Sequence, residues 1–126
     1  MKIEHVALWV LDLEKQRVFY ESYFSGKAGD KYVNKDKGLE TYFIYFDNGA
    51  RLELMKHTDV KNGKPSLYKG WAHIAFSLGS KATVNALSAK LKKDGFTLIT
   101  GPRITGDGYY ESIIEDPEGN RIELTV

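Results

Sequence analysis

The sequence predicts an α+β fold in which two tandem βαβββ modules form a cupped mixed sheet, with helices on its convex face. Two observations predict it. A histidine lies in the opening strand of each half, in Glu4-His5-Val6-Ala7-Leu8 and in Ala72-His73-Ile74-Ala75-Phe76, and a later strand of each half reads Arg-x-Glu-Leu, at 51–54 and 121–124. The spacing between halves is nearly equal, at 68 residues for the histidines and 70 for Glu53 and Glu123. The chain therefore has the pattern of a duplication.

The first module is expected over residues 1–56. A β-branched and aromatic run predicts a strand over 3–10, and Asp12 caps a helix that runs to Phe24 and stops at Gly26. On that helix the side chains near the buried side are expected to be Val18, Phe19 and Tyr23. A polar loop over 25–38 holds a short strand at 32–33. Two further strands, 40–46 and 51–55, form a hairpin across Asp47-Asn48-Gly49.

A linker is expected over 57–70, marked by Asn62-Gly63-Lys64-Pro65, and the second module over 71–126. Ser80 caps a helix that buries Val84, Leu87 and Leu91 and ends near Gly95. The strands are expected over 71–78, 96–99, 109–115 and 121–126, with loops at Gly101-Pro102 and 105–108 and a turn at 116–119. Both modules together make one domain, 1–126.

Composition narrows the classes of function. The chain has 126 residues, 42% of them hydrophobic, which is enough for a compact core. A net charge of +1 excludes the basic field of a nucleic-acid-binding protein, and no segment is long and apolar enough for a signal peptide or a membrane span. The absence of cysteine excludes thiolate ligands and thiol nucleophiles, and it fits a reducing compartment. We expect a cytoplasmic protein that acts on a small molecule.

The alternation of side chains along a strand places the two histidines and two glutamates on one face. Leu52 and Leu54 must face a helix, so Glu53 faces away, and the same parity applies to Glu123. His5 and His73 share that face. A buried carboxylate needs a compensating charge, which either a metal cation or an ion pair with Arg51 or Arg121 supplies. The pattern leaves both readings open.

These motifs together resemble the vicinal oxygen chelate superfamily, and within it glyoxalase I (lactoylglutathione lyase) and its relatives. The segments that carry the resemblance span the chain: Glu4-His5-Val6-Ala7, Leu11-Asp12-Leu13-Glu14, Phe19-Tyr20, the His73 strand and Asp116-Pro117-Glu118-Gly119-Asn120-Arg121-Ile122-Glu123. The resemblance implies the glyoxalase/bleomycin resistance/dioxygenase fold and one divalent metal ion per site, with His5, Glu53, His73 and Glu123 as ligands. Nickel, zinc, cobalt, manganese and magnesium all suit such a sulfur-free set.

The ligand set discriminates among branches of that superfamily. Extradiol dioxygenases and fosfomycin-modifying transferases typically use two His and one Glu, antibiotic-sequestering members lack the metal residues, and CoA-thioester epimerases usually carry Gln where Glu53 stands. Glyoxalase I uses two His and two Glu. The resemblance thus implies a metal-dependent lyase or isomerase that transfers a proton next to a carbonyl, on a 2-oxoaldehyde hemithioacetal or a similar chelated substrate. Glu53 and Glu123 are the candidate catalytic carboxylates, with Glu123 favoured as the base. A CoA-thioester epimerase and a non-catalytic, resistance-type binding protein stay open as alternatives.

The residues expected to recognise substrate depart from the family pattern. Relatives of glyoxalase I that use glutathione commonly have Arg four residues after the first His and Asn four residues after the first Glu. Here these positions hold Trp9 and His57, and we expect His57 in a loop. Trp9 offers one N–H donor and no bidentate fork, which argues against a glutathione-linked substrate. Glyoxalase I pairs the halves of two chains, so we expect a homodimer in which His5 and Glu53 of one chain meet the partner's His73 and the partner's Glu123.

Overall fold

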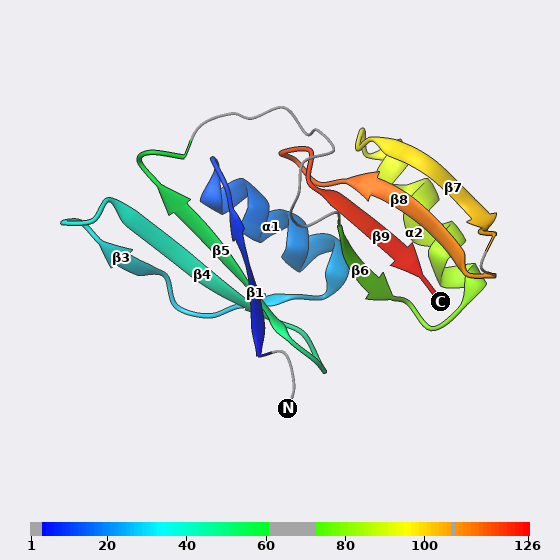
Figure 1. Cartoon of the computed structure of the whole chain (residues 1–126), viewed down its shortest axis with the longest axis horizontal. Coiled ribbons are helices and arrows are strands. Elements are labelled where there is room, and N and C mark those ends of the chain that lie inside the picture. The colour runs from blue at the N-terminus through cyan, green and yellow to red at the C-terminus, as the bar shows by residue number, and fades with distance from the viewer. Residues whose placement is uncertain (1–3, 61–72, 107) are drawn as a thin grey trace. The chain divides into compact units, whose positions relative to one another are not determined.

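A computed structural model describes residues 4–60, 73–106 and 108–126. The chain divides into two compact units, Met1–Gly63 and Lys64–Val126. Each unit is a mixed sheet with one helix packed on one face, and the predicted α+β class is confirmed (Figure 1). In the described part of the chain, no helix is long and apolar enough to cross a membrane. The predicted linker lies mostly outside the described residues.

The first unit is a five-stranded sheet with a single helix. Its elements are β1 (His5–Trp9), α1 (Leu13–Phe24), β2 (Lys27–Ala28), β3 (Tyr32–Asn34), β4 (Leu39–Tyr45) and β5 (Arg51–His57). The strand order is β1-β5-β4-β2, with β3 also paired to β4. β1 runs parallel to β5, while the other pairs are antiparallel. The crossover through α1 makes the parallel pairing possible, because parallel neighbours cannot be joined by a tight turn.

Strand alternation and a helix cap account for the core of this unit. The Asp12 carboxylate accepts a hydrogen bond from the Lys15 N–H at 3.0 Å and so caps α1 as predicted. The helix then covers the sheet face that carries Ile44, Leu52 and Leu54, all of them buried. Register pairs Ile44 with Leu52, so these side chains lie on the same face of neighbouring strands. The opposite face is left for the polar side chains of β1 and β5.

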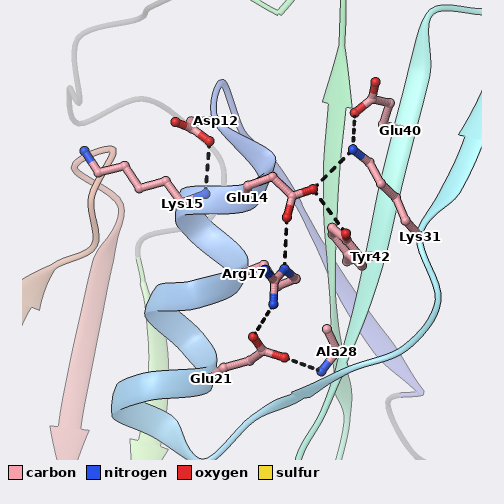
Figure 2. A network of polar contacts seen from close by, with 9 residues as sticks. All are labelled: Asp12, Glu14, Lys15, Arg17, Glu21, Ala28, Lys31, Glu40 and Tyr42. Carbon is pink, nitrogen blue, oxygen red and sulfur yellow. Dashed lines mark hydrogen bonds and ion pairs between the residues drawn. The ribbon is translucent and has the colours of Figure 1, made fainter.

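A network of ion pairs fastens α1 to the strands beside it (Figure 2). Glu14 accepts hydrogen bonds from Arg17 at 3.0 Å, from the Tyr42 hydroxyl at 3.1 Å and from Lys31 at 3.2 Å. Lys31 also pairs with Glu40 at 2.8 Å. The hydrogen bond from Arg17 is the main cause of a pKa for Glu14 below its ordinary value. The network lies on the helix side of the sheet, away from His5 and Glu53.

The second unit repeats the plan with four strands. Its elements are β6 (Ile74–Ser77), α2 (Lys81–Lys93), β7 (Leu98–Ile104), β8 (Tyr110–Glu115) and β9 (Arg121–Thr125). The strand order is β6-β9-β8-β7, and β6 runs parallel to β9. Ser80 caps α2, as predicted, by accepting a hydrogen bond from the Thr83 N–H at 3.1 Å. In each unit, the strand that begins at the histidine (β1) or directly after it (β6) is the parallel neighbour of the strand that carries the glutamate.

The structure corrects several details of the sequence prediction. Val18 was expected near the buried side of α1 but is 49% exposed, and the buried positions are Leu13, Gln16, Phe19 and Tyr20. The helix is rotated so that a polar residue, Gln16, faces inward, which an apolar pattern cannot predict. In α2 the buried set is Val84, Ser88 and Leu91, because Ser88 bonds the Ser112 hydroxyl at 2.6 Å.

Two strand boundaries also differ from the prediction. β2 was not predicted, because two residues carry too little pattern to reveal a strand. β7 begins later than predicted and continues through Gly101 and Pro102, which were expected to form a loop. β7 is at the edge of its sheet and its pairing with β8 shifts register twice, which are the conditions under which a strand tolerates Gly and Pro.

Candidate metal centre

The first unit brings His5 and Glu53 together on the face opposite α1. β1 and β5 are in register with Ala7 beside Glu53, so His5 lies two residues before the partner of Glu53. His5 Nε2 and Glu53 Oε2 are 3.8 Å apart. The His5 ring also contacts Phe43 of β4 edge-on, with ring centroids 5.4 Å apart. The imidazole is thus held between β1 and β4, above the carboxylate of the strand that separates them.

The second unit repeats this pairing residue for residue. Ala75 lies beside Glu123 in the register of β6 and β9, and His73 again stands two residues before that position. His73 Nε2 and Glu123 Oε2 are 3.4 Å apart. The structure therefore brings together two of the four predicted ligands in each unit. The common register explains why the spacing of the histidines and of the glutamates is so similar.

Both glutamates are largely buried, and no Lys or Arg of the described residues neutralises them. The Glu53 side chain is 17% exposed and that of Glu123 is 16% exposed, while each neighbouring histidine is 41% exposed. Among the described residues, neither carboxylate forms an ion pair with Lys or Arg. Arg51, which the alternative reading pairs with Glu53, pairs instead with Glu4. A buried carboxylate with no compensating charge is costly, so these two positions favour a bound cation.

The spacing of donors within each pair fits a divalent ion. At a tetrahedral zinc, nitrogen and oxygen donors bound at about 2.0–2.2 Å lie roughly 3.4 Å apart. The His73 and Glu123 atoms already have this separation, and a small side-chain rotation brings the 3.8 Å pair to it. Imidazole and carboxylate donors suit zinc, nickel, cobalt and manganese. No group of three or more His, Cys, Asp or Glu side chains that could hold a metal ion occurs among residues 4–60, 73–106 and 108–126, so each unit alone provides two donors.

Trp9 and His57 extend the same face of the first unit. Trp9 pairs with Met55 in the register of β1 and β5, and its ring lies 6.2 Å from the His57 ring at 77°. His57 was expected in a loop, but it is the last residue of β5. Its Nδ1 accepts a hydrogen bond from the Asp59 N–H at 3.1 Å. An aromatic pair, with Trp9 53% exposed, therefore lies beyond Glu53 on this face.

Glu4 is a polar neighbour of His5 to which the sequence prediction gave no role. Its carboxylate lies 2.5 Å from His5 Nδ1. Adjacent strand residues point to opposite faces, so alternation gave no reason to expect the contact. Glu4 precedes the first residue of β1, where that alternation does not apply.

Comparison with known proteins agrees with this architecture. The model of the Glyoxalase/Bleomycin resistance protein/Dioxygenase superfamily matches residues 2–124. The chain belongs to that superfamily. It is 24% identical to the uncharacterized protein YqjT of Bacillus subtilis (strain 168), over 97% of this chain and 96% of that protein.

Two solved structures extend the comparison. A possible glyoxalase from Bacillus cereus is 27% identical, with a TM-score of 0.73 over 100% of this chain and 99% of that one. The trypanothione-dependent glyoxalase I of Leishmania major is 22% identical, with a TM-score of 0.80 over 99% of this chain and 86% of that one. Because the identity is low, this second likeness concerns the fold alone. The match to the superfamily model confirms the predicted resemblance.

Proposed function

We propose that the protein is a metal-dependent lyase or isomerase of the glyoxalase I type, with His5, Glu53, His73 and Glu123 as ligands of one divalent ion. The observation that carries the proposal is the repeated His–Glu pair, in the same register in both units, with each carboxylate largely buried and without a Lys or Arg partner among the described residues. One pair leaves a coordination sphere half filled. Two pairs complete an N2O2 set.

The carboxylates also provide the proton-transfer group that such a reaction needs. A bound divalent ion would orient the oxygen atoms of the substrate and stabilise the negative charge that develops beside the carbonyl. Glu123 takes the proton from the carbon next to the carbonyl and returns it to the neighbouring carbon. Its limited exposure keeps that proton from exchanging freely with water. Glu53, equally buried, acts as the second carboxylate ligand.

Trp9 and His57 support a substrate other than a glutathione adduct. Relatives of glyoxalase I that use glutathione commonly have Arg and Asn at these positions. An Arg can hold a carboxylate through two parallel hydrogen bonds. Trp9 and His57 form an aromatic pair instead. With Nδ1 of His57 accepting from Asp59, the neutral ring offers a single Nε2–H donor toward a ligand. We infer a substrate whose remote part is apolar or aromatic, such as a hemithioacetal of a small neutral thiol.

Metal binding by purified apoprotein tests the donor set. We expect one Co²⁺ per site in the wild type and at least a tenfold weaker affinity in both His5→Ala and His73→Ala. His57→Ala is the matched control, because the chain has three histidines and this one is not in a His–Glu pair. If both pair variants bind Co²⁺ as tightly as the wild type, the proposed centre is wrong.

Mixing the two variants tests how the pairs combine. If each site draws on two chains of a homodimer, a heterodimer of His5→Ala and His73→Ala contains one intact site, so mixing restores part of the metal binding. If both pairs of a site belong to one chain, mixing restores nothing.

Turnover is then measured with hemithioacetals of methylglyoxal and several thiols, after loading with nickel, zinc, cobalt, manganese or magnesium. We expect a higher kcat/KM with a small neutral thiol than with glutathione. Metal binding without turnover of any adduct would favour the non-catalytic binding protein, and turnover of a CoA thioester would favour the epimerase.

A further inference from the structure

The residue that precedes the histidine differs between the two halves, and in the first unit it contacts the ring on the side away from Nε2. The Glu4 carboxylate contacts His5 Nδ1 through one oxygen, at 2.5 Å, and the Arg51 guanidinium through the other. The residue before His73 is Ala72, which has no carboxylate. The duplication therefore repeats the His–Glu pair, but the sequence does not repeat the glutamate that precedes His5.

Arg51 is itself held in place, so Glu4 is anchored. The guanidinium carbon lies 4.0 Å from the centre of the Phe43 ring, and Arg51 Nη1 donates a hydrogen bond to the Tyr45 hydroxyl at 3.4 Å. The Arg51 backbone N–H also donates to the Glu4 carbonyl oxygen at 3.0 Å. Phe43 thus contacts both Arg51 and His5, the two residues that the Glu4 carboxylate joins.

This arrangement determines which nitrogen of His5 carries the proton. The Glu4 carboxylate forms an ion pair with the Arg51 guanidinium, so it meets His5 Nδ1 as an acceptor. A carboxylate cannot donate, so Nδ1 of the neutral ring must be the donor. Nε2 then keeps its lone pair, and Nε2 is the atom that lies toward Glu53. A metal-binding histidine needs this combination of one hydrogen-bonded nitrogen and one free lone pair.

We propose that Glu4, anchored by Arg51, is a positioning residue that holds His5 in its Nδ1-protonated form with Nε2 free to bind metal. The inference rests on the proposed function for the identity of the ligand at Nε2, but the contact with Glu4 exists without metal. His5 is therefore oriented by a group outside the four-donor set.

The competing explanation is an exposed ion pair without a role. Glu4 is 57% exposed, and surface pairs often contribute little to stability. Stability therefore does not discriminate between the two explanations. The tautomer of His5 and the metal affinity do.

The test compares Glu4→Ala and Glu4→Gln with the wild type, and Glu40→Gln is the matched control because Glu40 is a partly exposed, ion-paired glutamate of the same unit. In apoprotein, ¹⁵N NMR of the neutral His5 ring should show Nδ1–H in the wild type and in Glu40→Gln, and a mixture of both forms in Glu4→Ala. Affinity for Co²⁺ should fall about 10- to 100-fold in Glu4→Ala. Glu4→Gln should recover part of the loss, because its amide oxygen can still accept from Nδ1–H.

The outcomes separate this inference from the proposed function. An unchanged tautomer and an unchanged Co²⁺ affinity in Glu4→Ala would overturn the positioning role. A wild type that binds no metal would overturn the proposed centre, while a tautomer that still depends on Glu4 would show that the orientation of His5 by Glu4 is correct.

Discussion

Replacing Gln16 with Met is expected to stabilise the protein. Gln16 is fully buried on α1, and neither its side-chain nitrogen nor its side-chain oxygen has a hydrogen-bond partner among the described residues. Leaving a buried polar group unpaired costs about 1–3 kcal/mol. Met has nearly the same length and helix propensity as Gln, so the helix itself loses little. The expected gain is about 2 kcal/mol, which corresponds to a rise in Tm of roughly 8 °C for a chain of this size.

Thermal and urea unfolding followed by circular dichroism measure this gain. Val18→Met is the matched control, because Val18 lies on the same helix but is 49% exposed, and its Tm should change little. Metal affinity should be the same in both variants, since α1 covers the face of the sheet opposite His5 and Glu53. A lower Tm for Gln16→Met would show that the amide has a partner in solution, and the reasoning would be refuted.

Two further predictions concern the carboxylates. Glu53→Gln and Glu123→Gln should weaken metal affinity by similar factors, because the two side chains are equally buried. Glu123→Gln should also lower kcat by a further factor of about 10²–10⁴, because the base is lost. Steady-state kinetics at saturating metal measure this difference, and equal kcat values for the two variants would contradict the assignment of the base. Glu14 has a folded-state pKa below the ordinary 4.5, so its contribution is present above that value and is lost as pH falls through the lower pKa. Glu14→Gln should remove this part of the acid-induced loss of stability, which is at most about 1 kcal/mol because the side chain is half exposed. The free energy of unfolding is measured as a function of pH for the variant and the wild type, and equal slopes in the acid range would contradict the prediction.

Local signals in the sequence predicted most of the fold. Asp12 and Ser80 cap their helices through the N–H three residues later, which is a short-range interaction that depends on residue type alone. The parity of β5 and β9 followed from their leucine and isoleucine side chains, and it placed Glu53 on the correct face. These features need no knowledge of distant contacts, so a single sequence suffices for them.

Features that depend on tertiary packing were not predictable in the same way. Gln16 and Ser88 occupy buried helix positions although they are polar, and only the facing elements make their burial understandable. The continuation of β7 through Gly101 and Pro102 depends on its place at the sheet edge. The contact of Trp9 with His57 joins β1 and β5, and the sequence alone does not predict that these strands are paired. In the candidate site, the register that places Ala7 beside Glu53 and Ala75 beside Glu123 likewise depends on strand pairing and was not predictable from the sequence.

The two His–Glu pairs have the same register while the residue beside each glutamate differs, and this bears on which carboxylate of the proposed centre acts as the base. His5 is held by Glu4 and by Phe43, and Glu53 lies beneath it in the strand between them. At the position corresponding to Phe43, the second unit pairs Ile113 with Glu123, and an aliphatic side chain offers no ring edge or face to an imidazole. A group that binds a metal firmly and a group that leaves it to carry a proton have opposite requirements for rigidity. Within the proposed centre, this difference favours the first unit as the anchor of the ion and Glu123, whose register neighbour on β8 is aliphatic, as the base.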